Sequence, residues 1–342
     1  MLLFPILLLV CSLFEPAFSY KVLIFNPAYG ASHANFLGKI ADILIDAGNE
    51  VTMLIPVYRD SKQLTGSKKI TKIVKMGQDP RAKAIFAKGG VESLVRAKVW
   101  TTDAEMKGLV YLVEKMNGAF AYQCEYIFQQ SEVLETLRNE HFDLGITESL
   151  FSCGFAIFDH IAIKTVINAE SNLFKDAVKW AHGEPAASAY YPGLFSPNND
   201  QMGFVARVKN MALMMFTKYI FSSRYSRELE AIKPYYNGTK SWEKHLSNVA
   251  FNFINSNQYL DYASPTLPKT VFIGGMQVNT KKNGKVELSQ EWEDVLSKRK
   301  QNVLVSFGSN AFSSDMPDEF KNAFLKVFAS MPDTTFIWKY EE

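Results

Sequence analysis

His33 is the residue of this 342-residue chain whose type and position best suit proton transfer. It follows the apolar run Lys21–Asn26 and lies in a predicted loop, at the edge where open parallel sheets bind ligands. A neutral imidazole there can take a proton from a substrate hydroxyl, because histidine titrates near the working pH of most proteins. The position predicts a general base, and a helix-capping or surface histidine is the alternative.

Glu148 is the predicted partner of that base. It follows the strand-like run Asp143–Thr147, which should neighbour the first strand. A carboxylate at this position would fix the tautomer of the imidazole and stabilise the imidazolium, whereas Asp143 lies at the opposite end of the run. The alternative is a carboxylate near a helix N-terminus, which the helix dipole favours without any catalysis. Hydrophobic periodicity does not separate these two interpretations.

A turn containing Ser306, Gly308 and Ser309 follows another apolar run and precedes a predicted helix over 317–329. Its backbone N–H groups and hydroxyls suit a phosphate, although such turns are common after strands. The sequence contains neither a Gly-x-Gly-x-x-Gly run nor a P-loop, which argues against a dinucleotide enzyme and a P-loop NTPase. The remaining histidines show no metal-ligand spacing, so we expect no metal site.

The elements that position these residues alternate between strand and helix. Strand 21–26, helix 35–47 and strand 51–55 form a βαβ unit, which favours a parallel sheet. The segment 60–130 is predicted to form helices and loops around that sheet. Further strands are predicted at 142–147, 165–168, 251–255, 271–273, 302–306 and 334–338, with helices at 155–160 and from Ser289 through Arg299.

Length and the first residues set the domain organisation. The apolar run 2–13, followed by Ala17-Phe18-Ser19, predicts a cleaved secretory signal peptide. The remaining length suits two domains. The predicted parts are a signal peptide (1–19), an N-terminal domain (20–277), a linker (278–300) and the start of a C-terminal domain (301–342). The sequon at Asn237 then predicts a glycan added in the lumen of the endoplasmic reticulum.

Composition limits the classes of partner. The 37 basic residues nearly balance the 35 acidic ones, so net charge predicts a small-molecule substrate and no nucleic acid. Beyond the signal peptide only Cys124 and Cys153 remain, too few for a disulfide-stapled scaffold, and whether they pair stays open. The segment 207–230 reads either as a basic amphipathic helix on a membrane surface or as a core-packed helix with a solvated basic face.

Several segments in the same order resemble the UDP-glycosyltransferases of animals, the glucuronosyltransferase family, and especially its nematode-like members. The resemblance covers the whole chain. The matching segments are Phe25-Asn26-Pro27 through Ser32-His33, Phe142 through Glu148 with Ser152-Cys153-Gly154, Asn255-Ser256 with Pro265 through Pro268 and Phe272 through Gly275, and Val303 through Ser309.

The resemblance implies an α/β protein of GT-B type, with a complete N-terminal Rossmann-like domain and only the first β-α-β of the C-terminal one. The substrates it implies are a small lipophilic acceptor and a UDP-sugar, a co-substrate, with no resident cofactor and no metal. His33 would deprotonate the acceptor hydroxyl, Glu148 would hold His33, and the sugar would be transferred with inversion. Ser306, Gly308 and Ser309 would contact the donor. Homo-oligomers, or hetero-oligomers with related transferases, are further partners to consider.

Two departures from the family qualify that expectation. The usual partner of the base is Asp, so Glu148 must retract or approach His33 from another angle. The family's main donor signature and its membrane anchor would lie beyond Glu342, so we expect this chain by itself to transfer no sugar. Its last strand, 334–338, should leave an exposed edge.

Two other classes of protein share some of these features. A non-catalytic lumenal binding protein, or a pseudoenzyme, would retain the acceptor domain. A secreted binding protein of periplasmic type shares the α/β pattern but not the ordered segments. Reading the transcript past Glu342 would separate the enzyme from the binder. Acceptor identity, donor sugar (glucuronic acid or glucose) and oligomeric state are not encoded in any motif found.

Overall fold

The computed structural model describes residues 19–58, 65–87, 100, 106–172, 176–276, 278, 288–308 and 311–341. By contacts between residues the chain divides into a first unit, 1–83 with 117–278, and a second unit, 84–116 with 279–342. The signal peptide predicted for 1–19 lies, except for Ser19, outside the described residues.

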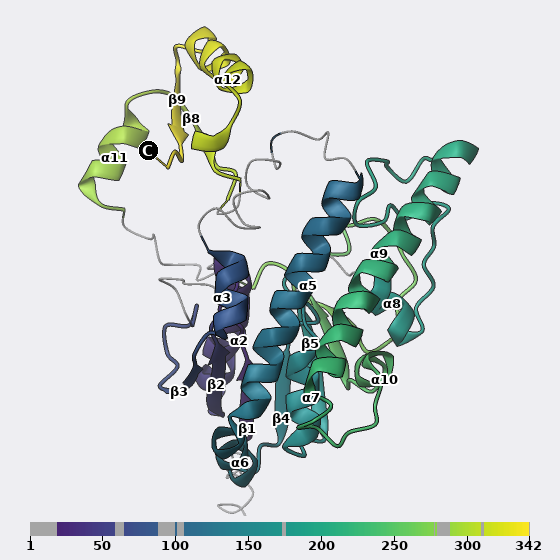
Figure 1. Ribbon diagram of the computed structural model, residues 1–342. Helices are drawn as coiled ribbons and strands as arrows, with labels where there is room; N and C mark the ends of the chain where they lie inside the picture. The colour runs from purple at the N-terminus through teal and green to yellow at the C-terminus, as the bar shows by residue number, and fades with distance from the viewer. Residues whose placement is uncertain are drawn as a thin grey trace, which may run out of the picture. The chain divides into compact units, whose positions relative to one another are not determined.

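Strands and helices alternate along the chain (Figure 1). As far as β7 they are β1 (Lys21–Phe25), α2 (Ala31–Asp46), β2 (Glu50–Pro56), β3 (Lys72–Met76), α3 (Pro80–Phe86), α5 (Met106–Gln129), α6 (Ser131–Asn139), β4 (Leu144–Thr147), α7 (Cys153–His160), β5 (Thr165–Glu170), α8 (Asp176–His182), α9 (Phe204–Ile232), α10 (Trp242–Ser247), β6 (Phe251–Ile254) and β7 (Thr270–Phe272).

The first unit contains a seven-stranded sheet in the order β3-β2-β1-β4-β5-β6-β7. Every neighbouring pair in it is parallel, which confirms the predicted sheet. Phe25 pairs with Leu54 of β2 and with Thr147 of β4, so these three strands end at the same level. The residues that follow β1 and β4 are thereby brought to one edge.

Strand β1 is buried on both faces. Leu23 and Phe25 belong to a core that includes residues of α5 and α7, and Val22 and Ile24 belong to a core that includes residues of α2. Successive side chains of a strand point to opposite faces, and helices cover both faces of a parallel sheet. The apolar run at the start of the mature chain is therefore the centre of the fold.

Strand β3 was not predicted. The segment 60–130 was expected to form only helices and loops around the sheet, whereas β3 pairs with β2 at the sheet edge. Its residues are mostly exposed, and Lys72 and Lys75 interrupt the apolar pattern. Charged side chains are common on edge strands because they oppose pairing with other chains. The same charges remove the hydrophobic signal by which a strand is recognised.

A disulfide joins Cys124 of α5 to Cys153, the first residue of α7. Both residues are fully buried. The sequence left this pairing open. Because the two cysteines are 29 residues apart, closing the loop stabilises the fold by roughly 3–4 kcal/mol in the chain-entropy account. Packing is therefore supported by one covalent link between two helices.

In the second unit, β8 (Gln301–Val305) pairs in parallel with β9 (Thr334–Trp338), and α12 (Asp318–Ser330) connects them. This confirms the predicted first β-α-β. Helix α11 (Gln290–Ser297) begins after Ser289 inside the predicted linker. The strand expected to be exposed, 334–338, is the better covered one, because rings of α12 stack on Phe336 and Trp338. The exposed apolar side chains belong to β8.

Candidate active site

His33 lies in the first turn of α2, so its expected place in a loop was wrong. The helix begins at Ala31, and Gly30 is its N-cap with an extended backbone. A Cβ at position 30 would lie 3.1 Å from Cδ2 of His33, so the glycine also leaves room for the imidazole. The ring is thus held by a helix at the carboxyl end of β1.

Glu148 follows the last residue of β4 and meets this imidazole. Its Oε2 lies 2.6 Å from Nδ1 of His33, and 2% of the Glu148 side chain and 16% of the His33 side chain are exposed. Nδ1 therefore donates to the carboxylate, which leaves the lone pair of Nε2 to accept a proton. Nε2 has no hydrogen-bond partner among the described residues. The structure thus brings together the two residues that the sequence predicted as a pair.

Ser171, which sequence reasoning missed, is the third member of this cluster. Its backbone N and its Oγ donate to Oε1 of Glu148 at 3.1 and 2.7 Å. The same Oγ lies 2.9 Å from Nδ1 of His33. Ser171 follows β5 directly, but the predicted strand 165–168 ended two residues early. A strand extended to Glu170 would have placed Ser171 at the same edge as the other two.

The backbone of Ser171 is fixed by the next strand. Asn255, which follows β6, donates its side-chain amide to the Ser171 carbonyl at 3.0 Å. Its backbone N–H donates to the Glu170 carbonyl at 2.9 Å. Ser171 is therefore restrained from both sides.

Fully buried polar side chains link β4, β5 and β6 beneath this edge. Asn168 accepts from the backbone N of Ser149 at 2.9 Å and donates to Asn252 at 3.2 Å. Ser149 also donates its hydroxyl to Glu170. Hydrogen bonds in a dry interior are strong and strongly directional. The ladder therefore keeps the three strand ends in register where Glu148 and Ser171 begin.

Glu228 of α9 occupies the position that the alternative interpretation gave to Glu148. Its Oε2 accepts from the backbone N of Ser152 and of Cys153, at 2.7 and 2.9 Å, at the start of α7. A carboxylate there interacts favourably with the helix dipole. Burial raises the pKa of Glu228 to about 7, although the hydrogen bonds from Ser152 and the charge of Arg224 oppose the rise.

Aromatic rings pack beside the histidine loop. Tyr29, which precedes α2, contacts Phe120 and Phe151 edge to face with centroids 5.3 and 5.8 Å apart. Tyr58 stacks on Phe151 at 4.8 Å. Phe120, Phe151 and Tyr58 are buried, so they are core residues, and Tyr29 alone of the four is partly exposed. Aromatic pairs of this geometry add to area burial and fix the loop before His33.

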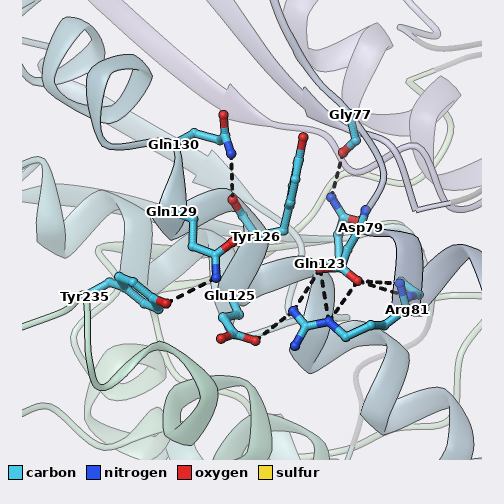
Figure 2. A network of polar contacts seen from close by, with 10 residues as sticks. Gly77, Asp79, Arg81, Gln123, Glu125, Tyr126, Gln129, Gln130 and Tyr235 are labelled. Carbon is cyan, nitrogen blue, oxygen red and sulfur yellow. Dashed lines mark hydrogen bonds and ion pairs between the residues drawn. The ribbon is translucent and has the colours of Figure 1, made fainter.

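A polar network fastens the end of β3 to α5 (Figure 2). Arg81 donates to Asp79 and to Glu125, each at 2.8 Å, and Gln123 accepts from the backbone N of Asp79. Burial alone would raise the pKa of Asp79, but hydrogen bonds from Arg81 hold it below its usual value. The carboxyl end of the edge strand is thereby fixed to α5.

The donor turn predicted from Ser306, Gly308 and Ser309 belongs to the second unit. Ser306 and Gly308 are exposed, and Ser309 lies outside the described residues. Gly308 has a φ of +80°, a conformation that favours glycine, and its N–H donates to Ser306 Oγ at 3.4 Å. Lys339 donates to the Gly308 carbonyl. The turn therefore carries a cation, whereas the first turn of α12 is acidic.

Other predicted features lie on the surface or concern absences. Asn237 is exposed in the loop between α9 and α10. Within the described ranges, no group of three His, Cys, Asp or Glu side chains could hold a metal ion. In the same part of the chain, no helix is both long and apolar enough to cross a bilayer.

Two solved structures share this arrangement of elements. The glycotransferase of kitacinnamycin superposes with a TM-score of 0.53 at 10% identity, covering 95% of this chain and 66% of its own. Os79 from O. sativa, in complex with U2F and trichothecene, superposes with a TM-score of 0.52 at 11% identity, covering 94% of this chain and 67% of its own. The fold is therefore that of the GT-B glycosyltransferases.

The sequence comparison is more specific. The UDP-glucoronosyl and UDP-glucosyl transferase family matches residues 20–342, and the chain belongs to that family. It is 25% identical to the putative UDP-glucuronosyltransferase ugt-56 of Caenorhabditis elegans over 323 residues, which cover 94% of this chain and 60% of that relative. The chain thus spans about three fifths of the length of such curated relatives.

Proposed function

We propose that this protein acts in the transfer of a glucuronosyl or hexosyl group from a UDP-sugar to a hydroxyl of a small lipophilic acceptor. The observation that carries the proposal is the 2.6 Å contact between His33 Nδ1 and Glu148 Oε2. It orients the imidazole so that Nε2 is the basic nitrogen. Such an arrangement suits a base that is positioned by a carboxylate.

In the proposed step, His33 Nε2 takes the proton of the acceptor hydroxyl. The oxygen bonds to the anomeric carbon as the bond from that carbon to UDP breaks, and UDP leaves with the electron pair. The anomeric configuration inverts because the oxygen attacks from the face opposite UDP. Glu148 stabilises the imidazolium that forms. The proposal involves no metal and no resident cofactor, because the UDP-sugar is a co-substrate.

Ser171 explains how a glutamate can replace the aspartate usual in the family. Its N–H and O–H both bind Oε1 of Glu148, which draws back the longer side chain and leaves Oε2 for His33. We therefore assign Ser171 as a positioning residue. It acts on the base through Glu148.

The donor and the cellular setting complete the proposal. Ser306, Gly308 and Ser309 contact the donor phosphates, and Lys339 adds a positive charge beside the turn. The protein works in the lumen of the secretory pathway with a glycan on Asn237, which is exposed. Self-association, or association with related transferases, belongs to the same proposal.

The test uses the chain itself with UDP-glucose or UDP-glucuronic acid and a set of phenolic and steroid acceptors. Residues that grip the donor supply much of the rate, so we expect no product from this chain alone. If product forms, His33→Gln should lower turnover by about 10²–10⁴-fold. Turnover that His33→Gln leaves unchanged would contradict the assignment of the base.

If no product forms, the base is tested without turnover. The Nδ1 proton of His33 should give a low-field NMR signal that disappears in Glu148→Gln, and the exposed Glu132→Gln is the matched control. Persistence of that signal in Glu148→Gln would refute the pair. Acceptor binding that is equally tight in wild type and His33→Gln would agree with the proposal, because a base need not contribute to ground-state affinity.

A further inference from the structure

The first half of α9 presents an exposed row of large apolar side chains. The row consists of Phe204, Val208, Met211, Met215 and Tyr219, spaced four, three, four and four residues apart. Each of them is between 55% and 82% exposed. At 1.5 Å per residue the row is roughly 22 Å long. A continuous apolar row of this length on a surface indicates a binding site.

The charges beside this row are all positive. Arg207, Lys209 and Lys218 are exposed, and no acidic residue occurs between Phe204 and Arg227. A helix with an apolar row and only basic charges is typical of helices that lie in the headgroup region of a bilayer. The charge pattern therefore favours an anionic surface as the partner.

The opposite side of the helix is anchored, so the apolar row is not the result of a loose helix. Asn210 is fully buried, donates to the carbonyls of Ser188 and Tyr191 at 2.9 and 2.8 Å, and accepts from the Gly193 N–H. Figure 1 shows α9 as a long helix beside α8. The loop that Asn210 holds against α9 carries further exposed apolar side chains, among them Phe195.

Two other occupants fit the face less well. The helix is not apolar enough to cross a membrane, so it must lie along a surface. In an isologous pairing of two copies, the same patch faces itself. That pairing would collect the three cations of each copy in one interface, with no carboxylate on this face to neutralise them.

We propose that residues 204–219 of α9 bind the surface of a phospholipid bilayer that contains anionic headgroups. The apolar row enters the interface between headgroups and acyl chains. The three cations bind the phosphate and carboxylate groups of the lipids. This contact is independent of the proposed sugar transfer and holds the first unit on the membrane without any spanning segment of its own.

The test is co-sedimentation of the full chain with vesicles at low and at physiological salt. One set is phosphatidylcholine alone, and the other contains about a third phosphatidylserine. The wild type should bind the anionic vesicles more tightly. The double variant Met211→Glu/Met215→Glu should bind at least about tenfold more weakly, because two apolar side chains no longer enter the interface.

Control variants separate the row from exposed apolar residues in general. Ile43→Glu and Ile73→Glu change side chains that are 44% exposed on α2 and β3, and both should bind vesicles like the wild type. Lys209→Gln should weaken binding to the anionic vesicles roughly fivefold and leave binding to neutral vesicles unchanged. Circular dichroism confirms that each variant folds.

Two outcomes would overturn the proposal. One is a wild type that sediments with neither kind of vesicle at low salt. The other is a concentration-dependent dimer, measured by light scattering, that Met211→Glu/Met215→Glu dissociates while vesicle binding is unaffected. That second result would assign the face to a second copy of the chain.

Discussion

The same sequence of elements, a strand, a loop, a helix and a parallel strand, occurs once in each unit with opposite burial. Strand β1 has neighbours on both sides, β2 and β4, and its Phe25 is fully buried. Strand β8 pairs only with β9, and its Leu304 is 71% exposed. Helix α2 buries seven residues, whereas α12 buries none.

The loops that follow the two strands differ accordingly. Next to β1, neighbouring strands supply Glu148 and Ser171, and His33 is restrained by both. After β8, Ser306 and Gly308 are exposed, and each makes a weak or solvent-facing contact. A polar cluster can be rigid and dry only where adjacent strands bring their ends to the same place.

The largest test of this difference is a matched pair of truncations. Phe25→Ala should lower the free energy of unfolding by about 3–5 kcal/mol, because it leaves a cavity in a core that cannot close. Leu304→Ala should change it by less than about 0.5 kcal/mol. Urea unfolding followed by circular dichroism measures both. Similar losses in the two variants would mean that β8 is covered in solution.

The buried carboxyl of Glu228 gives the first unit a pH dependence of intermediate size. Its folded pKa, about 7, is above its ordinary value of 4.5, so the folded state binds more protons between these values. Stability should therefore fall as pH rises through this window, by up to about 3 kcal/mol.

Glu228→Gln should remove that part of the pH dependence, and the exposed Glu319→Gln of α12 should not. Unfolding free energies at pH 5 and pH 8 give the comparison for wild type and both variants. Equal slopes in wild type and Glu228→Gln would show that the carboxyl does not titrate in this range.

The smallest expected effect concerns Ser171. Ser171→Ala removes one hydrogen bond to Glu148 and keeps the bond from the backbone N–H, a loss of about 1 kcal/mol. The low-field Nδ1 proton signal of His33 should broaden, and any turnover should fall roughly fivefold in kcat with little change in KM. Ser171→Thr should restore both, whereas Ser306→Ala should leave the His33 signal unchanged. A signal unaffected by Ser171→Ala would remove the positioning role.

The sequence predicted the fold best where apolar runs end sharply. His33 and Glu148 were found because a strand-like run of apolar residues precedes each. Ser171 was missed because β5 ends in Asn168, Ala169 and Glu170, polar or small residues that conceal the end of a strand. β3 was missed because an edge strand bears charges on its exposed faces.

The buried polar contacts could not be predicted because their partners are distant in the sequence. Glu228 binds Ser152 across 76 residues, and Asn168 binds Asn252 across 84. A buried Glu in a long helix and an exposed one have similar local sequences. Only the packing of α9 on the start of α7 distinguishes them.

The order of strands in the first unit also bears on how the protein is made. Read along the chain, each strand from β2 to β7 pairs with one that was synthesised before it: β2 and β4 beside β1, β3 beside β2, and β5, β6 and β7 each beside the preceding strand. No strand has to wait for a later one in order to be paired. Because chains leave the ribosome from their N-terminus, the sheet can grow outward from β1 during translation, with at most one unpaired edge on each side.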